Sequence, residues 1–463
     1  MKIIASILFL ALSTVMVHAQ VTVRNQFEFT HWDEGDRDIL ENWSDVSVQR
    51  DQYQIGLRYE INHPPDPYIY PQEDLLKEYD LTYGYAELTH GVVTFTAGDY
   101  YTMFGRGLVL RTYEDRNLRV DNNLRGARLR VSGSGYQVTG IAGKMRDKYN
   151  RREDAVYGID GEVNLLESLK IGGSYLQQDD ENRIWSSRLN LYHSLGDMVV
   201  EVAKPQWTDQ ISSYFAMNAA AGPFALTFEY KDYHHLAFRN SFGTEYNAAP
   251  SLSREHSYTL LNRHPHALNM DDEKGYQIEL NYYPGLTWEF TLNHSETVNH
   301  AGVRLFREYY GEVHHYVSDN LDVRSAGSWT FDLTTNTKSI TPLIDILYTL
   351  SEREQLHLGY QHQHITNRFN SSEYDDDLLQ IEYSRSPWYS IALVGEYTNQ
   401  DQLKNISLDR NYWIYGSLTL QFGAKHQIEL LYGSRQAGFV CMGGICRYEP
   451  EFEGLEIKLV NRF

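Results

Sequence analysis

Residues 276–293 read YQIELNYYPGLTWEFTLN. Apolar and polar side chains alternate from Tyr276 to Tyr282 and again from Leu286 to Leu292, and Pro284-Gly285 separates the two runs. Successive side chains of a β-strand point to opposite faces, so each run has one apolar and one polar face. The Pro-Gly pair favours a tight turn between the runs. This stretch therefore predicts a hairpin of two amphipathic β-strands.

The same pattern recurs along most of the chain, for example in residues 185–191 and 224–231. From Val46 onward we count about 22 such strands, with a range of roughly 18–24 and about ten residues in each. Short turns alternate with long polar stretches, which are residues 62–78, 101–122, 144–154, 232–274, 398–410 and 434–450. A soluble β-sandwich or β-helix would alternate too, but it rarely needs so many strands in series. The sequence predicts an all-β fold, a transmembrane antiparallel β-barrel with short periplasmic turns and long outer loops.

Composition excludes several other classes of protein. The 463 residues carry 62 acidic and 41 basic side chains, a formal net charge of -21 that argues against a nucleic-acid partner. After the N-terminus no apolar run approaches the roughly 20 residues that a membrane-spanning helix needs. The two cysteines are too few for a disulfide-framework scaffold.

Both ends of the chain predict export. Residues 1–19 have the short basic start, apolar core and small-residue end of a cleavable signal peptide. Residues 20–45 are expected to form an N-terminal arm or an extra strand, and residues 46–463 the outer-membrane barrel. The last strand alternates through Leu455, Ile457 and Leu459 and ends at Phe463. It resembles the C-terminal signal by which outer-membrane barrels are recognised for insertion, which implies contact with the barrel-assembly machinery and with outer-membrane lipid.

The densest group of charges lies between Ala97 and Arg130, AGDYYTMFGRGLVLRTYEDRNLRVDNNLRGARLR. One interpretation is a loop folded into the barrel lumen, where arginines face carboxylates across a constriction that sets selectivity. The alternative is an outer loop held by salt bridges to neighbouring loops. The candidate constriction residues are Asp99, Arg106, Arg111, Glu114, Asp115 and Arg116.

Part of this stretch also carries a resemblance. The run from Gly98 to Leu108, continued by residues 121–126, DNNLRG, resembles a family of exported, porin-like outer-membrane barrels from Gram-negative bacteria without a characterised function. The resemblance implies the barrel fold and the outer-membrane location. It implies no catalytic residues.

The polar faces of the strands predict the chemistry of the lumen. If these faces point inward, they bring a set of glutamates into it, namely Glu229, Glu279, Glu289, Glu382, Glu396 and Glu429. Such a lumen would concentrate cations and repel anions. The alternative is that these glutamates pair with lumenal Lys, Arg and Tyr and pack a closed barrel.

The remaining candidates for chemistry are weaker. Cys441 and Cys446 flank a Gly-rich tip and are expected to form a small disulfide in an oxidising compartment. Histidine pairs occur at residues 234–235, 264 and 266, 314–315, and 362 and 364, but zinc needs three or four ligands, so no metal site and no cofactor are predicted. No catalytic motif is present, so an enzyme is not expected.

Three functions fit this barrel. The first is a porin-like channel for small polar solutes. The second is a structural or interaction barrel that presents outer loops, above all residues 232–274, to a surface or secretion partner. The third is a hydrolase embedded in the barrel.

Overall fold

The computed structural model describes residues 19–33, 36–179, 182–263, 266–400, 410–442 and 445–463, and, of residues 440–446, no side chains. A single antiparallel sheet of 24 strands closes on itself. In chain order these strands are β1 (Gln20–Trp32), β2 (Arg37–Arg50), β3 (Tyr53–His63), β4 (Tyr79–His90), β5 (Val93–Tyr100), β10 (Leu124–Ser132), β11 (Tyr136–Arg146), β12 (Arg152–Leu166), β13 (Leu169–Gln178), β14 (Asn182–His193), β15 (Gly196–Pro205), β16 (Ser212–Ala221), β17 (Phe224–His234), β18 (Asp272–Tyr282), β19 (Trp288–Val298), β20 (Arg304–Ser318), β21 (Leu321–Asp332), β22 (Thr337–Ser351), β23 (Glu354–Asn367), β24 (Glu373–Arg385), β25 (Tyr389–Thr398), β26 (Tyr412–Phe422), β27 (His426–Arg435) and β30 (Phe452–Arg462).

Eight short elements lie in the connections between barrel strands. They are the 3-10 helix η2 (Glu73–Leu75), the helix α2 (Thr259–Asn262), and the strands β6 (Met103–Phe104), β7 (Leu110–Arg111), β8 (Glu114–Asp115), β9 (Val120–Asp121), β28 (Gly438–Met442) and β29 (Ile445–Glu449). No helix among the described residues combines the length and the apolar character needed to cross a membrane.

The barrel closes between its first and last strands. β1 pairs with β2 on one side and with β30 on the other, and Arg24 lies opposite Arg462 in this last pairing. The start of β1 and the end of β30 therefore lie at the same end of the barrel. Every connection at that end is short, such as residues 51–52 and 91–92, and we call it the turn end. The long connections, including residues 64–78, 101–123, 235–271 and 436–451, all leave from the opposite, loop end.

The predicted fold class is confirmed, and the strand number lies at the top of the expected range. Of the 24 strands, β1 and β2 begin before Val46, which leaves 22 from β3 onward. Residues 20–45, for which the sequence left an arm or an extra strand open, form β1 and most of β2. Residues 1–18 of the predicted signal peptide lie outside the described residues.

The two faces of the wall have opposite character, as β3 illustrates. Tyr53, Ile55, Leu57 and Tyr59 are exposed on the outside, whereas Arg58, on the alternate face, is buried inside the barrel. Comparable apolar rows are exposed on other strands, as on β25 and β26. An apolar outer face around a polar interior is the arrangement that a hydrocarbon environment favours.

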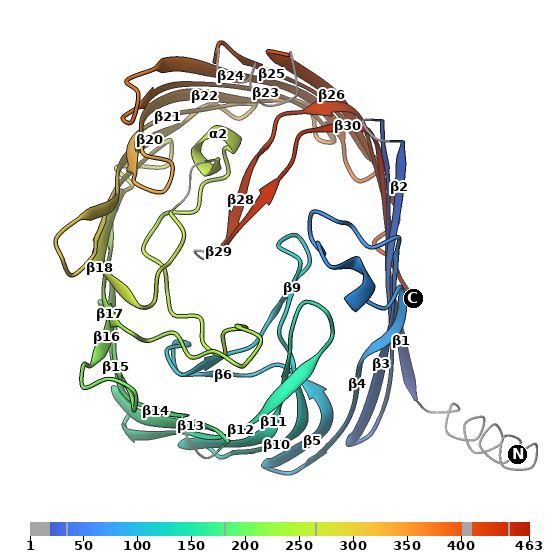
Figure 1. The fold of residues 1–463 in the computed structure, drawn as a ribbon. Coiled ribbons are helices and arrows are strands. Elements are labelled where there is room, and N and C mark those ends of the chain that lie inside the picture. Colours follow the sequence, from blue (N-terminus) through green and yellow to red (C-terminus); the bar gives the residue numbers. More distant parts are fainter. Residues whose placement is uncertain (1–18, 34–35, 180–181, 264–265, 401–409, 443–444) are drawn as a thin grey trace, which may run out of the picture.

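Two connections fold back into the barrel and meet there. The inner segment, residues 101–123, and the long loop, residues 235–271, both lie inside the ring of strands, the loop in its described parts 235–263 and 266–271, together with β28 and β29 (Figure 1). Side chains of the inner segment, including Phe104, Leu108 and Leu110, pack in one buried apolar cluster with Leu236 and Tyr246 of the long loop. The hydrophobic core of this molecule thus lies between the two inserted connections and the wall that faces them.

Candidate functional site

The inner segment leaves the wall after Tyr100 of β5 and returns to it at Leu124 of β10. Between these points it forms two small antiparallel pairs, β6 with β7 and β8 with β9. Figure 1 shows β6 and β9 within the ring of barrel strands. Of the stretch 97–130, for which the sequence allowed a lumenal segment or an outer loop, residues 101–123 therefore lie within the ring of strands. Residues 97–100 and 124–130 were wrongly included, because they belong to the wall strands β5 and β10.

A glycine turn fixes one side of the inner segment against the wall. Gly105 and Gly107 have φ values of 53° and 88°, which side chains rarely adopt. A Cβ atom on Gly105 would lie 2.4 Å from the Glu201 carboxylate of β15, and one on Gly107 would lie 2.6 Å from the Ala248 carbonyl oxygen. The close approach lets the Arg106 amide donate a hydrogen bond of 2.7 Å to Glu201. The Phe-Gly-Arg-Gly sequence is therefore a turn that packs against the wall, and its arginine binds the wall through its backbone amide.

The long loop holds the middle of the inner segment. Asn247 donates through Nδ2 to the Leu108 carbonyl oxygen at 2.8 Å, and the Arg111 amide donates to the Tyr246 carbonyl oxygen at 2.9 Å. The long loop is itself tied to the wall at Glu273 of β18. This carboxylate accepts a hydrogen bond from the Asn269 amide and pairs with His266 and with Lys231 of β17. The side chains of Lys231 and Glu273 are both completely buried.

Two arginines bind the other side of the inner segment to β1 and β2. Arg119 lies between two wall carboxylates, with Nη2 at 2.9 Å from Glu28 and at 2.5 Å from Glu41. Arg116 lies 3.0 Å from Asp45 of β2 and donates through Nη1 to Gln26 of β1 at 3.1 Å. Both guanidinium groups also lie over the ring of Trp43, a favourable position for a cation.

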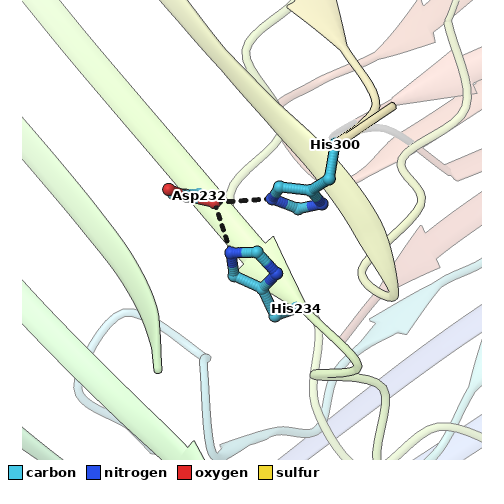
Figure 2. A group of neighbouring side chains, drawn as sticks. All are labelled: Asp232, His234 and His300. Carbon is cyan, nitrogen blue, oxygen red and sulfur yellow. Dashed lines mark hydrogen bonds and ion pairs between the residues drawn. The ribbon is translucent and has the colours of Figure 1, made fainter. Parts of the chain in front are cut away.

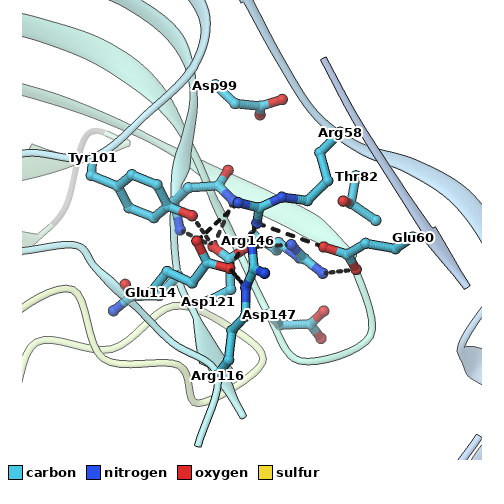
Figure 3. Close-up of polar contacts among 12 residues, drawn as sticks. Arg58, Glu60, Thr82, Asp99, Tyr101, Glu114, Arg116, Asp121, Arg146 and Asp147 are labelled. Atoms are coloured by element: carbon cyan, nitrogen blue, oxygen red, sulfur yellow. Dashed lines mark hydrogen bonds and ion pairs between the residues drawn. The ribbon is translucent and has the colours of Figure 1, made fainter. Parts of the chain in front are cut away.

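A second group of ion pairs joins the inner segment to β3 and β11 (Figure 3). Arg58 of β3 donates two parallel hydrogen bonds of 2.9 Å to the Glu114 carboxylate, which is the geometry in which arginine binds a carboxylate most strongly. Arg146 of β11 lies 2.5 Å from Asp121 and 3.2 Å from Glu60. Burial by itself raises the pKa of Asp121, but Arg146 and Arg58 outweigh it, and the pKa lies below its ordinary value. The Asp121 carboxylate is therefore charged at neutral pH.

The six constriction candidates divide into three groups. Glu114 and Arg116 belong to the ion-pair network just described. Asp99 lies in the wall, where it binds Arg125 and Arg152 and accepts the Gly84 amide. The other three make contacts of other kinds. The Arg106 backbone amide binds Glu201, the Arg111 guanidinium lies over the Tyr113 ring, and Asp115 accepts a hydrogen bond from the Leu118 backbone amide.

Sequence reasoning missed the wall residues of the network. Arg58 and Glu60 have a usable signal, because they occupy the inward positions of an alternating strand. Arg146 ends β11, where the alternation gives no guidance.

The six predicted lumenal glutamates have partners in the structure. Glu229 accepts from Tyr214, Glu279 from Arg254, Glu289 from Tyr316, Glu382 from Gln380, Glu396 from Arg263 and Glu429 from Gln427. Two of these donors, Arg254 and Arg263, come from the long loop. Four of the six donors are arginine or tyrosine, as in the alternative in which the glutamates pair with lumenal Lys, Arg and Tyr, and the other two are glutamines. The ion preference of the lumen stays a prediction.

A polar cavity lies beside the inner segment. Its volume is about 580 Å³, and wall residues of β1, β2, β27 and β30 line it together with the inner segment and β29. Its lining includes the carboxylates Glu28, Glu41 and Glu456 and the bases Arg116, Arg119 and Arg435. Groups of both signs therefore face the same space, which suits hydrated ions and small polar molecules.

The backbones of β28 and β29 place Cys441 opposite Cys446 in register. Their side chains lie outside the described part of the structure, so the disulfide stays a prediction. Of the histidine pairs, His362 binds Asp377 and His364 binds Asp375, both on the β23–β24 surface. His264 lies outside the described residues.

Comparisons with known proteins place the fold and the family. The P pilus usher (PapC) translocation pore matches with a TM-score of 0.53 and 7% identity, over 96% of this chain and 99% of that one. A chain of the E. coli P pilus tip assembly intermediate PapC-PapD-PapK-PapG matches with a TM-score of 0.57 and 8% identity, over 96% of this chain and 60% of that one. At these identities the likeness concerns the fold alone.

No curated protein sequence matches the chain. A family model described as a family of unknown function, DUF6029, matches residues 12–463. The chain therefore belongs to the DUF6029 family.

Proposed function

We propose that the protein is an outer-membrane channel for small polar solutes and that the inner segment is its constriction. The observation that carries this proposal is the path of residues 101–123, which extend inside the barrel from Glu201 on β15 to Glu28, Glu41 and Asp45 on β1 and β2. A barrel of this strand number encloses a space too wide for its own wall side chains to fill. An inserted, charged segment leaves a narrow polar path through that space.

The exposed apolar face supports the membrane location. Rows of Ile, Leu and Tyr side chains point outward from β3, while ionised groups such as Arg58 and Glu60 point inward. Outer-membrane lipid would cover the outer face. A folded, detergent-solubilised barrel should therefore run at a different electrophoretic mobility before and after boiling.

The experiment that tests the channel is single-channel recording of the purified barrel in a planar bilayer. We expect stepwise currents whose size falls as neutral solutes small enough to enter the lumen are added. Absence of current from a barrel that still shows heat-modifiable mobility would contradict the channel. That result would favour the interaction barrel, whose partner would then be sought among proteins that bind residues 235–271.

The pairing of the lumenal charges predicts how selectivity can be changed. In Arg119→Gln, the lining of the cavity loses one positive charge, that of the guanidinium group between Glu28 and Glu41. We expect the permeability ratio of cations over anions, measured as the reversal potential in a salt gradient, to rise by roughly twofold or more.

The matched control is Arg50→Gln, which removes the same charge from an exposed site at the turn end. It should leave the reversal potential close to that of the wild type. Equal reversal potentials for both variants and the wild type would place Arg119 outside the conducting path.

A further inference from the structure

A cluster of metal-ligating side chains lies where β17, β18 and the connection after β19 meet at the loop end. Asp232 and His234 are two residues apart on β17, and His300 comes from the connection between β19 and β20. Nε2 of His234 lies 3.0 Å from Asp232 Oδ1, and Nε2 of His300 lies 2.8 Å from the same oxygen (Figure 2). Among the described residues this is the one group of three whose possible ligand atoms all lie within 4.8 Å of one another.

We infer that Asp232, His234 and His300 bind a divalent transition-metal ion of the zinc type. Two imidazole nitrogens and a carboxylate oxygen form a three-ligand set that zinc commonly uses, with the fourth position left to water. Ligand atoms in a tetrahedral zinc site lie about 3.3 Å apart, because each bond is about 2.0–2.1 Å long. The two nitrogen–oxygen separations here are shorter by a few tenths of an ångström, and the rings of His234 and His300 stack with centroids 3.6 Å apart, so the side chains must rotate to admit the ion.

A fourth residue, Asp272, orients the ligand His300. Asp272 of β18 accepts a hydrogen bond of 2.6 Å from Nδ1 of His300 and another of 2.9 Å from its amide. With Nδ1 held in this way, Nε2, which contacts Asp232 at 2.8 Å, is the ring nitrogen that can bind the ion, and the ion would displace the proton that Nε2 donates to Asp232. Histidine ligands of metal ions usually donate their second nitrogen to such a carboxylate, which fixes the tautomer and the ring orientation. Asp272 is therefore a positioning residue of this site.

The cluster faces outward, away from the lumen. On β17, Lys231 and Tyr233 are fully buried toward the inside, so the alternate residues Asp232 and His234 lie on the outer face. Tyr230, one alternation nearer the turn end, is exposed on that same outer face. The side chains of Asp232, His234 and His300 are each 19–29% exposed, which leaves room for a water ligand.

The position gives the ion a mechanical role. The ion would tie residues 299–303 to the ends of β17 and β18 through His300. This site does not depend on the constriction or on the channel, because none of its ligands faces the lumen. It would stabilise the loop end whatever passes through the barrel.

The test uses the full-length mature barrel, purified in detergent without a histidine tag and stripped with a chelator. We expect titration calorimetry with Zn²⁺ alone to give one equivalent bound with micromolar or tighter affinity. Co²⁺ should produce the visible absorption bands of a four-coordinate site with nitrogen ligands, and Zn²⁺ should remove them. His234→Ala and His300→Ala should abolish both signals.

Two further variants make the assignment specific. Asp272→Asn keeps all three ligands and should weaken Zn²⁺ binding by about 10–100-fold while the Co²⁺ bands persist. His235→Asn alters the neighbouring histidine, whose φ of 46° asparagine tolerates well, and should bind Zn²⁺ like the wild type.

The inference is overturned if the stripped wild type binds no Zn²⁺. It is equally overturned if His300→Ala binds as much as the wild type, because the ion would then lie at another of the surface His–Asp pairs. Heat-modifiable mobility confirms that each variant is folded.

Discussion

Replacing residues 102–122 with a short glycine–serine linker is expected to raise the single-channel conductance by at least about threefold. The inner segment occupies the interior between β15 and the β1–β3 wall, and its removal opens that space. The wall charges that it leaves behind, such as Glu41 and Arg58, would then be hydrated by the water that enters. The long loop also loses the apolar partners Phe104, Leu108 and Leu110, so it should loosen and widen the path further.

The control for this deletion is a barrel in which residues 369–371, between β23 and β24, are replaced by glycine and serine. This connection includes Phe369, whose side chain is 90% exposed, and we expect no change in conductance there. Both variants must show heat-modifiable mobility before they are compared. A folded deletion variant that conducts like the wild type would show that the inner segment is not the constriction.

Lys231→Met is expected to lower the free energy of unfolding by about 3–5 kcal/mol. The ammonium group is completely buried beside Glu273, so its removal leaves a carboxylate in the interior without its cation. His266 and the Asn269 amide still contact Glu273, but neither replaces a fixed positive charge. The change in the free energy of unfolding is measured by unfolding the barrel in urea in lipid vesicles. The folded fraction is the fraction that keeps heat-modifiable mobility.

The double variant Lys231→Met/Glu273→Gln tests the cause. It removes both charges but keeps an oxygen that accepts the Asn269 amide. We expect it to recover at least half of the stability lost in the single variant, because the penalty comes from the unpaired charge. A double variant less stable than Lys231→Met would mean that Glu273 acts chiefly by holding the long loop.

The fold was predictable because one physical rule repeats along nearly the whole chain. A strand between lipid and a polar interior must alternate, and residues 276–292 do so through two strands and their turn. The same rule applies to β1 and β2, yet the sequence did not decide whether residues 20–45 form an N-terminal arm or an extra strand. Asp38, a polar residue on the outward face of β2 near the loop end, interrupts the alternation there.

The ion-pair network was less predictable than the wall. The arginine-rich stretch made Glu114 and Arg116 candidates for a constriction, but their partners across the lumen depend on how the segment folds inward. Arg119 and Glu28, for example, are 91 positions apart. Strand registers place Asp45 beside Arg58, and no local pattern reveals that the inserted Arg116 will bind the first and Glu114 the second.

The outward cluster of Asp232, His234 and His300 was also only partly predictable from the sequence. His234 was recognised as one of an adjacent pair, although its useful neighbour is Asp232, two positions away on the same face. The third ligand, His300, is 68 positions from Asp232 and reaches the site only because β18 and β19 bring the chain back. A search for histidine and aspartate at a spacing of two on predicted strands would have found the first half of the site.

The pairing of β1 with β30 sets the order of events during biogenesis. β1 and β30 are far apart in the sequence, and their residues Asn25 and Asn461 are separated by 436 positions. Until β30 is in place, one edge of β1 offers a row of unsatisfied amides and carbonyls to any passing strand. The unfolded chain must therefore be shielded until β30 pairs, and a variant that lacks residues 452–462 cannot seal this edge.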